Sequence, residues 1–125
     1  MKRLTLTLGM VALATVLAAC SGASAAPGSP AAPADPNAPV VTAKDMKFLE
    51  AEVKVPAGKA FQLVLDNQEG APHNVAIFDA AGSKLFAGEI VSNSKVTYQV
   101  PALAAGSYPF ICEVHPDMKA TIVAE

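Results

Sequence analysis

The side chains best suited to bind a metal lie near the C-terminus of the 125-residue chain, in the segment Cys112-Glu113-Val114-His115-Pro116-Asp117-Met118. Thiolate, imidazole and thioether are donors that suit copper in both of its oxidation states. Steps of three residues, from Cys112 to His115 and on to Met118, allow one loop to turn all three side chains inward. We therefore expect this segment to supply ligands to a copper ion.

One more imidazole would complete a set of two His, one Cys and one Met, and the chain has one other His, His73. It follows the turn-forming sequence Gly70-Ala71-Pro72 and precedes the strand-like segment Val75–Phe78. Taken singly, a buried Cys or Met is usually core filler, and a His is usually a surface or core residue. The joint spacing of the four residues favours metal ligation over these ordinary explanations.

Two other roles for Cys112 fit the sequence less well. Zinc sites favour Cys and His ligands, and Met is a poor ligand for zinc. A disulfide would need Cys20, the other Cys of the chain, which the leader sequence predicts to be acylated or cleaved away. Ligation by a metal would protect the single remaining thiol of an exported chain.

The segments that must position these ligands show the alternating pattern of β-strands. Apolar side chains recur at every second position in 61–66, 96–100 and 108–112. Clusters rich in Gly, Pro, Ser and Asn separate such segments, and Glu69–Pro72 is one of them. Only Asp45–Ala51 carries a weak helical pattern. This organisation of residues 40–125 predicts an all-β domain, either a β-sandwich or a small barrel.

Residues 1–19 have the organisation of an export signal. Two basic residues precede an apolar run over 4–19, which is shorter than the about 20 residues of a membrane-spanning helix. The run ends in Leu17-Ala18-Ala19-Cys20, which resembles the bacterial lipobox, where cleavage precedes a Cys that is then acylated. We expect a cell-envelope lipoprotein, held to the membrane through Cys20 and facing the periplasm or the extracellular side. The alternative is an ordinary secretory signal, cut near residue 25 or 26.

Residues 20–39 are expected to form a tether. After Cys20 they contain only small residues, Pro, one Asp and one Asn, so no large apolar side chain can stabilise a fold. Pro recurs at every third position, which matches the three residues per turn of polyproline II: Pro27, Pro30, Pro33, Pro36 and Pro39. Whether semi-stiff or featureless, this segment would hold the folded domain, residues 40–125, away from its lipid anchor.

The composition excludes several classes of protein. With 52% hydrophobic and 16% charged residues, the chain is not a charge-rich disordered protein. A formal net charge of −2 gives no basic surface, so nucleic acid is not an expected partner. Two His and two Cys leave few groups for a catalytic constellation, and no small-molecule substrate is expected.

Residues 40–125 resemble the cupredoxins, the type 1 blue copper proteins, and among them the amicyanin and plastocyanin types. The matching sequences are Val55-Pro56-Ala57-Gly58-Lys59, Pro72-His73-Asn74-Val75, and Tyr108-Pro109-Phe110-Ile111-Cys112 before the ligand loop. The Cys-x-x-His-x-x-Met interval is the short one of amicyanin. The resemblance implies a Greek-key β-sandwich of about seven to eight strands that binds one type 1 copper ion.

The resemblance also implies a role for each site residue. The trigonal copper ligands are His73, Cys112 and His115, the long axial ligand is Met118, and Asn74 hydrogen-bonds between the two ligand loops. Such a site exchanges single electrons and breaks no substrate bond, so the implied function is that of an electron carrier and not of an enzyme. Redox proteins are the implied partners, docking near the ligand His115 on the exposed loop.

The chain departs from the family pattern at two places. Ala120 stands where many relatives have Gly soon after the Met ligand. Glu113 and Asp117 bring two acidic residues into the ligand loop. We expect them to make the rim around His115 more negative than a plain apolar docking surface.

Three alternatives to an electron carrier stay open from the sequence. A copper-handling module that binds Cu(I) for delivery or storage would use the same ligands without a redox role. A copper enzyme such as a nitrite reductase needs further His ligands, which this chain does not contain. A metal-free β-sandwich acting as a binding module would leave the spacing of the ligand residues unexplained.

Overall fold

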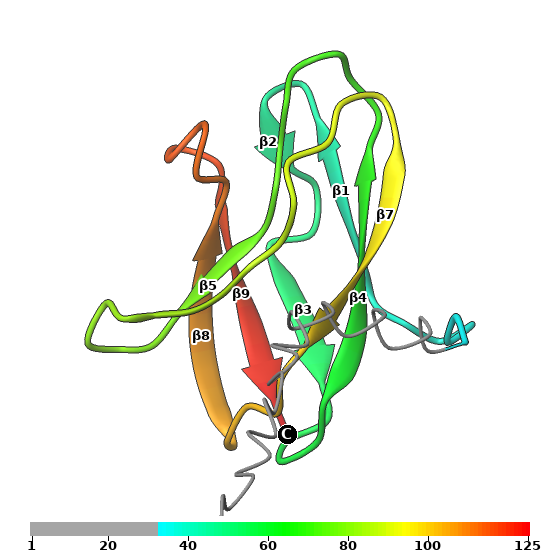
Figure 1. Cartoon of the computed structure of the whole chain (residues 1–125). Coiled ribbons are helices and arrows are strands. Elements are labelled where there is room, and N and C mark those ends of the chain that lie inside the picture. Colours follow the sequence, from blue (N-terminus) through cyan, green and yellow to red (C-terminus); the bar gives the residue numbers. More distant parts are fainter. Residues whose placement is uncertain (1–32) are drawn as a thin grey trace, which may run out of the picture. The chain divides into compact units, whose positions relative to one another are not determined.

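The computed structural model describes residues 33–125, which form nine β-strands (Figure 1). In chain order the strands are β1 (Val40–Lys44), β2 (Lys47–Phe48), β3 (Glu52–Val55), β4 (Phe61–Asn67), β5 (Ala76–Phe78), β6 (Lys84–Ala87), β7 (Lys95–Val100), β8 (Gly106–Ile111) and β9 (Lys119–Ala124). Among these described residues there is no helix capable of crossing a bilayer. The expected signal peptide over 1–19, the expected lipidation site Cys20 and the tether up to residue 32 lie outside them.

Two sheets packed face to face make up the domain (Figure 1). One sheet has the strand order β2-β1-β4-β7, and the other has the order β3-β9-β8-β5-β6. The pairs β1–β4 and β3–β9 are parallel, and the other neighbouring strands are antiparallel. Strands adjacent in space are therefore often distant in sequence, as in β-sandwiches with crossed connections. The predicted all-β sandwich is confirmed.

Apolar side chains from alternating strand positions fill the space between the sheets. Leu63 and Leu65 of β4, Phe110 of β8 and Ile122 of β9 have no exposed surface. Successive side chains of a strand point to opposite faces of its sheet, so such positions form one continuous apolar face. Each large apolar side chain contributes about 1.5–3 kcal/mol by its burial. This packing gives the strand ends around the candidate site fixed positions.

The structure differs from the sequence prediction at Asp45–Ala51, where the weak helical pattern forms no helix. Asp45 and Met46 have positive φ values of 52° and 57° and reverse the chain into the two-residue strand β2. Phe48 of β2 is buried against Phe110, with ring centroids 5.1 Å apart. The burial of Phe48 outweighs the weak helical propensity, and β2 brings the number of strands to nine.

The segment 33–39, the last part of the expected tether, is bonded to the sandwich. The side-chain oxygen of Gln62 accepts a hydrogen bond from the Asp35 N–H at 2.8 Å, and its amide nitrogen donates to the Pro33 carbonyl at 2.7 Å. The Val64 N–H donates to the Pro39 carbonyl at 2.9 Å. The chain therefore joins the domain near the beginning of β4, whereas the candidate site lies beyond the end of this strand.

Candidate metal centre

The ligand loop, residues 112–118, begins where β8 ends and leads into β9 (Figure 1). The Cys112 N–H donates to the Met118 carbonyl at 3.0 Å, and the Met118 N–H donates to the His115 carbonyl at 2.9 Å. These two bonds close the loop into a compact turn. Cys112 and Met118 are buried, whereas His115 is half-buried, so the loop offers both inward and outward-reaching side chains.

His73 reaches the same place from the loop between β4 and β5. It pairs with Val91 through two backbone hydrogen bonds, each of 3.0 Å. Asn67, the last residue of β4, donates to the carbonyls of Ala71 and Val91 at 2.8 Å and accepts from the Glu69 N–H at 3.0 Å. Backbone and side-chain bonds therefore fix the loop that carries His73, whose ring is fully buried.

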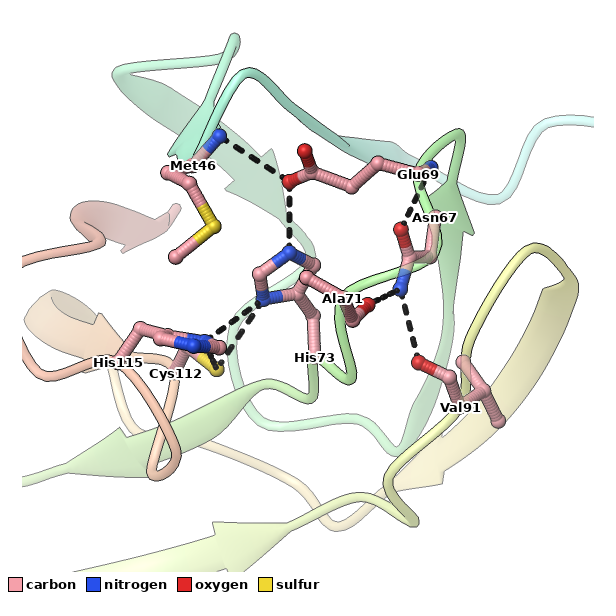
Figure 2. Close-up of polar contacts among 8 residues, drawn as sticks. All are labelled: Met46, Asn67, Glu69, Ala71, His73, Val91, Cys112 and His115. Atoms are coloured by element: carbon pink, nitrogen blue, oxygen red, sulfur yellow. Dashed lines mark hydrogen bonds and ion pairs between the residues drawn. The ribbon is translucent and has the colours of Figure 1, made fainter.

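The side chains of His73, Cys112 and His115 converge on one point (Figure 2). The Cys112 Sγ lies 3.6 Å from His73 Nδ1 and 3.9 Å from His115 Nδ1, and the two Nδ1 atoms are 3.2 Å apart. The point equidistant from three atoms at these separations lies about 2.1 Å from each, near the roughly 2.0–2.1 Å of metal–imidazole bonds. The three donor atoms thus enclose a space suited to one metal ion.

Glu69 sets the tautomer of the His73 ring. Its Oε1 accepts from His73 Nε2 at 2.7 Å and from the Met46 N–H at 3.1 Å (Figure 2). Partial burial acts to raise the pKa of Glu69, but the hydrogen bonds from His73 and Met46 outweigh it, and the pKa lies below its usual value. Because the ionised carboxylate can only accept, Nε2 of His73 carries the hydrogen and Nδ1 presents its lone pair to Cys112. A metal-ligating imidazole is commonly held in this way.

Asn74 connects the loop of His73 to the ligand loop. Its Oδ1 accepts from the Glu113 N–H at 2.9 Å, and its Nδ2 donates to the Gly88 carbonyl at 3.0 Å and to Glu113 Oε2 at 2.8 Å. The other carboxylate oxygen of Glu113 accepts from Lys84 Nζ at 2.7 Å. The hydrogen bond from Lys84 and then the one from Asn74 hold the pKa of Glu113 below its usual value. Glu113 is therefore ionised and bonded to two other segments.

The structure places the five site residues expected within residues 33–125 at one end of the sandwich. It brings the donor atoms of His73, Cys112 and His115 together, and it buries Met118 at the end of the same loop. Asn74 is 1% exposed and bonds to the ligand loop. No disulfide joins Cys112 to any described residue.

Sequence reasoning missed two residues of this site, Asn67 and Glu69. Asn67 occupies the position after Leu63 and Leu65 in the inward-facing alternation of β4, where a further apolar residue would be expected. Glu69 lies four residues before His73, within a cluster that the sequence predicts only as turn-forming. Two signals could have identified them: a polar residue in a core alternation, and a carboxylate near a proposed ligand His.

The donor set fits copper better than the other common metals. Two imidazoles and a thiolate, with a thioether in the same loop, match the ligands that bind both Cu(I) and Cu(II). Structural zinc sites use four Cys or His ligands, and the group found among residues 33–125 has three. Calcium and magnesium require oxygen ligands, which the converging atoms do not supply.

Comparison with known proteins agrees with this geometry. Residues 9–124 match the family described as cupredoxin-like domain. Amicyanin-alpha of Methylorubrum extorquens is 38% identical over 80 residues, which cover 64% of this chain and 66% of the relative. Amicyanin of Paracoccus versutus is 36% identical over 87 residues, which cover 69% of this chain and 64% of the relative. The matches thus span slightly less than two thirds of the length of these two proteins.

Solved structures show the same architecture. The crystal structure of amicyanin from Paracoccus versutus aligns with a TM-score of 0.59 and 31% identity, covering 75% of this chain and 87% of that chain. Reduced auracyanin from Roseiflexus castenholzii aligns with a TM-score of 0.60 over 69% of this chain and 94% of that chain, and its 18% identity shows a shared fold alone. Amicyanin-like cupredoxins bind one copper ion, and the group around Cys112 could hold it. With a family match over nearly its whole length, the chain belongs to the cupredoxin-like domain family.

Proposed function

We propose that this protein is an exported one-electron carrier that holds one type 1 copper ion between His73, Cys112 and His115, with Met118 as the axial ligand. The observation that carries the proposal is the approach of two imidazole nitrogens and one sulfur to within 3.9 Å of one another. Relatives named amicyanin, at 36% and 38% identity, support electron transfer as the role of such a site.

Bound copper would supply the one-electron couple, and the residues of the chain keep the ligands in place. Glu69 and the pairing with Val91 fix the ring of His73. The hydrogen bond from the Cys112 N–H to the Met118 carbonyl joins the two ends of the ligand loop. Ligands held by the fold need little rearrangement when the charge at the metal changes, which favours rapid electron exchange.

The route for electrons would be the ring of His115. His73 and Cys112 are fully buried, whereas His115 is half-buried at the surface of the ligand loop. Its apolar neighbour Val114 is 40% exposed, which suits contact with a partner protein. Lys84 pairs with Glu113 and offsets part of the negative charge expected on this rim. Redox proteins docking near His115 are the proposed partners.

The cellular setting is proposed from the leader sequence. Residues 1–19 would be a lipoprotein signal peptide, Cys20 the acylated N-terminus, and residues 20–39 a tether to the domain of residues 40–125. Mass spectrometry of the mature protein tests this proposal. A lipid-modified N-terminal Cys20 is expected, and a free N-terminus at Ser21 or beyond would contradict it.

The metal site is tested by adding Cu(II) to the purified protein and recording the visible spectrum. An intense blue colour from a short copper–thiolate bond is expected, and Cys112→Ser should abolish it because a hydroxyl group is a hard, weakly acidic donor. The matched control is Lys54→Met, which removes an exposed ion pair with Glu125 and should stay blue. A colourless wild type or a blue Cys112→Ser variant would contradict the site.

Voltammetry of the blue protein separates the carrier from the copper-handling module. A reversible one-electron wave is expected of a carrier. Copper binding without such a wave would contradict electron carriage and support copper delivery or storage through the same ligands.

A further inference from the structure

Glu113 lies inside the ligand loop, and its contacts extend to two other segments. Its Oε2 accepts from Asn74 Nδ2 at 2.8 Å, and its Oε1 accepts from Lys84 Nζ at 2.7 Å. Its N–H donates to Asn74 Oδ1 at 2.9 Å. One residue of the loop thus bonds both to the neighbour of His73 and to β6 at the edge of the second sheet.

The carboxylate of Glu113 completes the hydrogen bonding of a buried amide. Asn74 is 1% exposed, so in the folded chain its amide bonds to protein groups. One proton of its Nδ2 goes to the Gly88 carbonyl at 3.0 Å, and the other goes to Glu113. A residue without an acceptor at position 113 would leave a buried N–H of Asn74 unpaired, which is unfavourable.

Lys84 holds the other oxygen of the same carboxylate. The ion pair is partly exposed, with side-chain exposures of 50% for Lys84 and 33% for Glu113, so alone it would contribute little. The ion pair instead orients the carboxylate of Glu113, because a carboxylate held by Lys84 through one oxygen presents the other oxygen to Asn74. The three side chains form a continuous bonded group from β6 to the ligand loop.

We propose that Glu113 is a positioning residue that, with Lys84 and Asn74, latches the ligand loop so that Cys112 and His115 already stand in ligating positions before copper binds. We call these three side chains the Glu113 latch. The part of this inference that concerns copper rests on the proposed function. The part that concerns the loop does not, since the latch closes through hydrogen bonds of the protein itself.

Amide hydrogen exchange of the full chain without copper tests the loop. The Cys112 and Met118 amides bond within the loop, so their exchange reports its opening. Glu113→Ala should accelerate both by about tenfold, because it unpairs a buried amide proton. Lys84→Met should accelerate them about two- to threefold, because it removes only the ion pair.

The control for this measurement is Lys54→Met, which removes the exposed Lys54–Glu125 ion pair and should leave the loop amides unchanged. Exchange in Glu113→Ala no faster than in this control would overturn the latch. Equal acceleration of amides in the β4–β7 pairing would also overturn it, because the residue would then support the whole fold and not the loop.

The visible spectrum of the copper-loaded protein tests the positioning of the ligands. Glu113→Ala should change the position or intensity of the copper–thiolate band, and Glu113→Gln should restore it, because the amide oxygen still accepts from Asn74. Both variants remove the same negative charge. An effect that the two share therefore comes from the charge, and an effect of Glu113→Ala alone comes from the lost hydrogen bond to Asn74. A wild-type spectrum in Glu113→Ala, or the same altered spectrum in both variants, would overturn the proposal. A wild type that stays colourless would refute the copper site, while the exchange measurement would still decide the latch.

Discussion

Two buried amide side chains on β4 hold very different parts of the molecule. Asn67, at the end of the strand and 2% exposed, bonds to Ala71, Val91 and Glu69 in the loops of the candidate metal centre. Gln62, near the beginning and 9% exposed, bonds to Pro33 and Asp35 of the segment that enters the domain. Five positions at about 3.3 Å each separate the two by roughly 17 Å along the strand.

The two amides also point to opposite faces of the sheet. Asn67 follows Leu63 and Leu65 in the inward alternation, so it takes a place in the core that an apolar residue would otherwise fill. Gln62 lies on the outer face, where the entering segment covers it. A polar group placed toward the core needs all of its partners, because water cannot reach it.

This difference reflects a difference in composition between the middle of the domain and the end that carries the candidate centre. The middle is apolar, whereas Asn67, His73 and Asn74, three of the four buried polar residues in the part of the chain described, gather around the candidate centre. All of their buried side-chain nitrogen and oxygen atoms have hydrogen-bond partners. We infer that the apolar middle supplies most of the stability, and that the buried polar side chains at the metal end hold the loops that carry the proposed ligands, His73 among them.

The largest effect is expected from Asn67→Leu, measured as the free energy of unfolding of the copper-free protein in urea. Leucine fits an inward position by size, but it leaves the Ala71 carbonyl without its donor and the Glu69 N–H without its acceptor. The Val91 carbonyl loses one of its two donors and still accepts from the His73 N–H. We expect a loss of about 2–4 kcal/mol.

Gln62→Leu is the matched control for this experiment, because it makes a similar amide-to-leucine change on the same strand. An equal or larger loss of stability in Gln62→Leu would contradict the distinction between the two ends. A loss below about 1 kcal/mol in Asn67→Leu would show that solvent or other groups replace its bonds.

The sequence predicted the sandwich and much of the candidate site for physical reasons. The alternation of residues such as Leu63 and Leu65 reflects a strand with one buried and one outer face. This pattern can be recognised in the sequence of one strand, even when its partner strand is unknown. The ligand spacing in residues 112–118 is local, so a loop between paired strands can bring the side chains together. His73 followed from the same chemistry, because two His are all that the chain contains.

The features that escaped prediction depend on contacts that turns and separate segments make in the folded chain. The bond from Glu69 to His73 requires the turn between β4 and β5, and the bond from Met46 requires the left-handed turn before β2. The pairing of Lys84 with Glu113 joins residues 29 positions apart. Composition and periodicity do not determine the distance between such side chains, so these contacts follow only from the folded structure.

A smaller effect, confined to the metal end, is expected from Glu69→Gln. An amide oxygen still accepts from His73 Nε2, but the negative charge that strengthens the imidazole as a donor is lost. We expect copper affinity to fall about 10- to 100-fold. The reduction potential should rise by roughly 40 mV, about 1 kcal/mol, because the lost charge stabilised Cu(II) more than Cu(I).

The control for this change is Asp66→Asn, which removes a carboxylate from β4 that pairs with Lys95 at 3.3 Å and not with a proposed ligand. Its potential should move much less than that of Glu69→Gln. Equal shifts in the two variants would mean that overall charge, and not the bond to His73, controls the site. Competition with a copper chelator and voltammetry provide the two measurements.

The smallest effect is expected from Gln62→Leu at the other end of β4. The variant loses two hydrogen bonds to the segment 33–39, but the freed Asp35 N–H and Pro33 carbonyl can reach water. We therefore expect a loss of only about 0.5–1.5 kcal/mol in the free energy of unfolding. Limited proteolysis should cut the freed segment faster than in the wild type. The visible spectrum and the reduction potential should stay unchanged, because the apolar middle of the sandwich separates this end from the ligand loops. A shift in either would show that the two ends are coupled through β4. It would contradict the distinction between an apolar middle that supplies stability and an end that fixes the ligand loops.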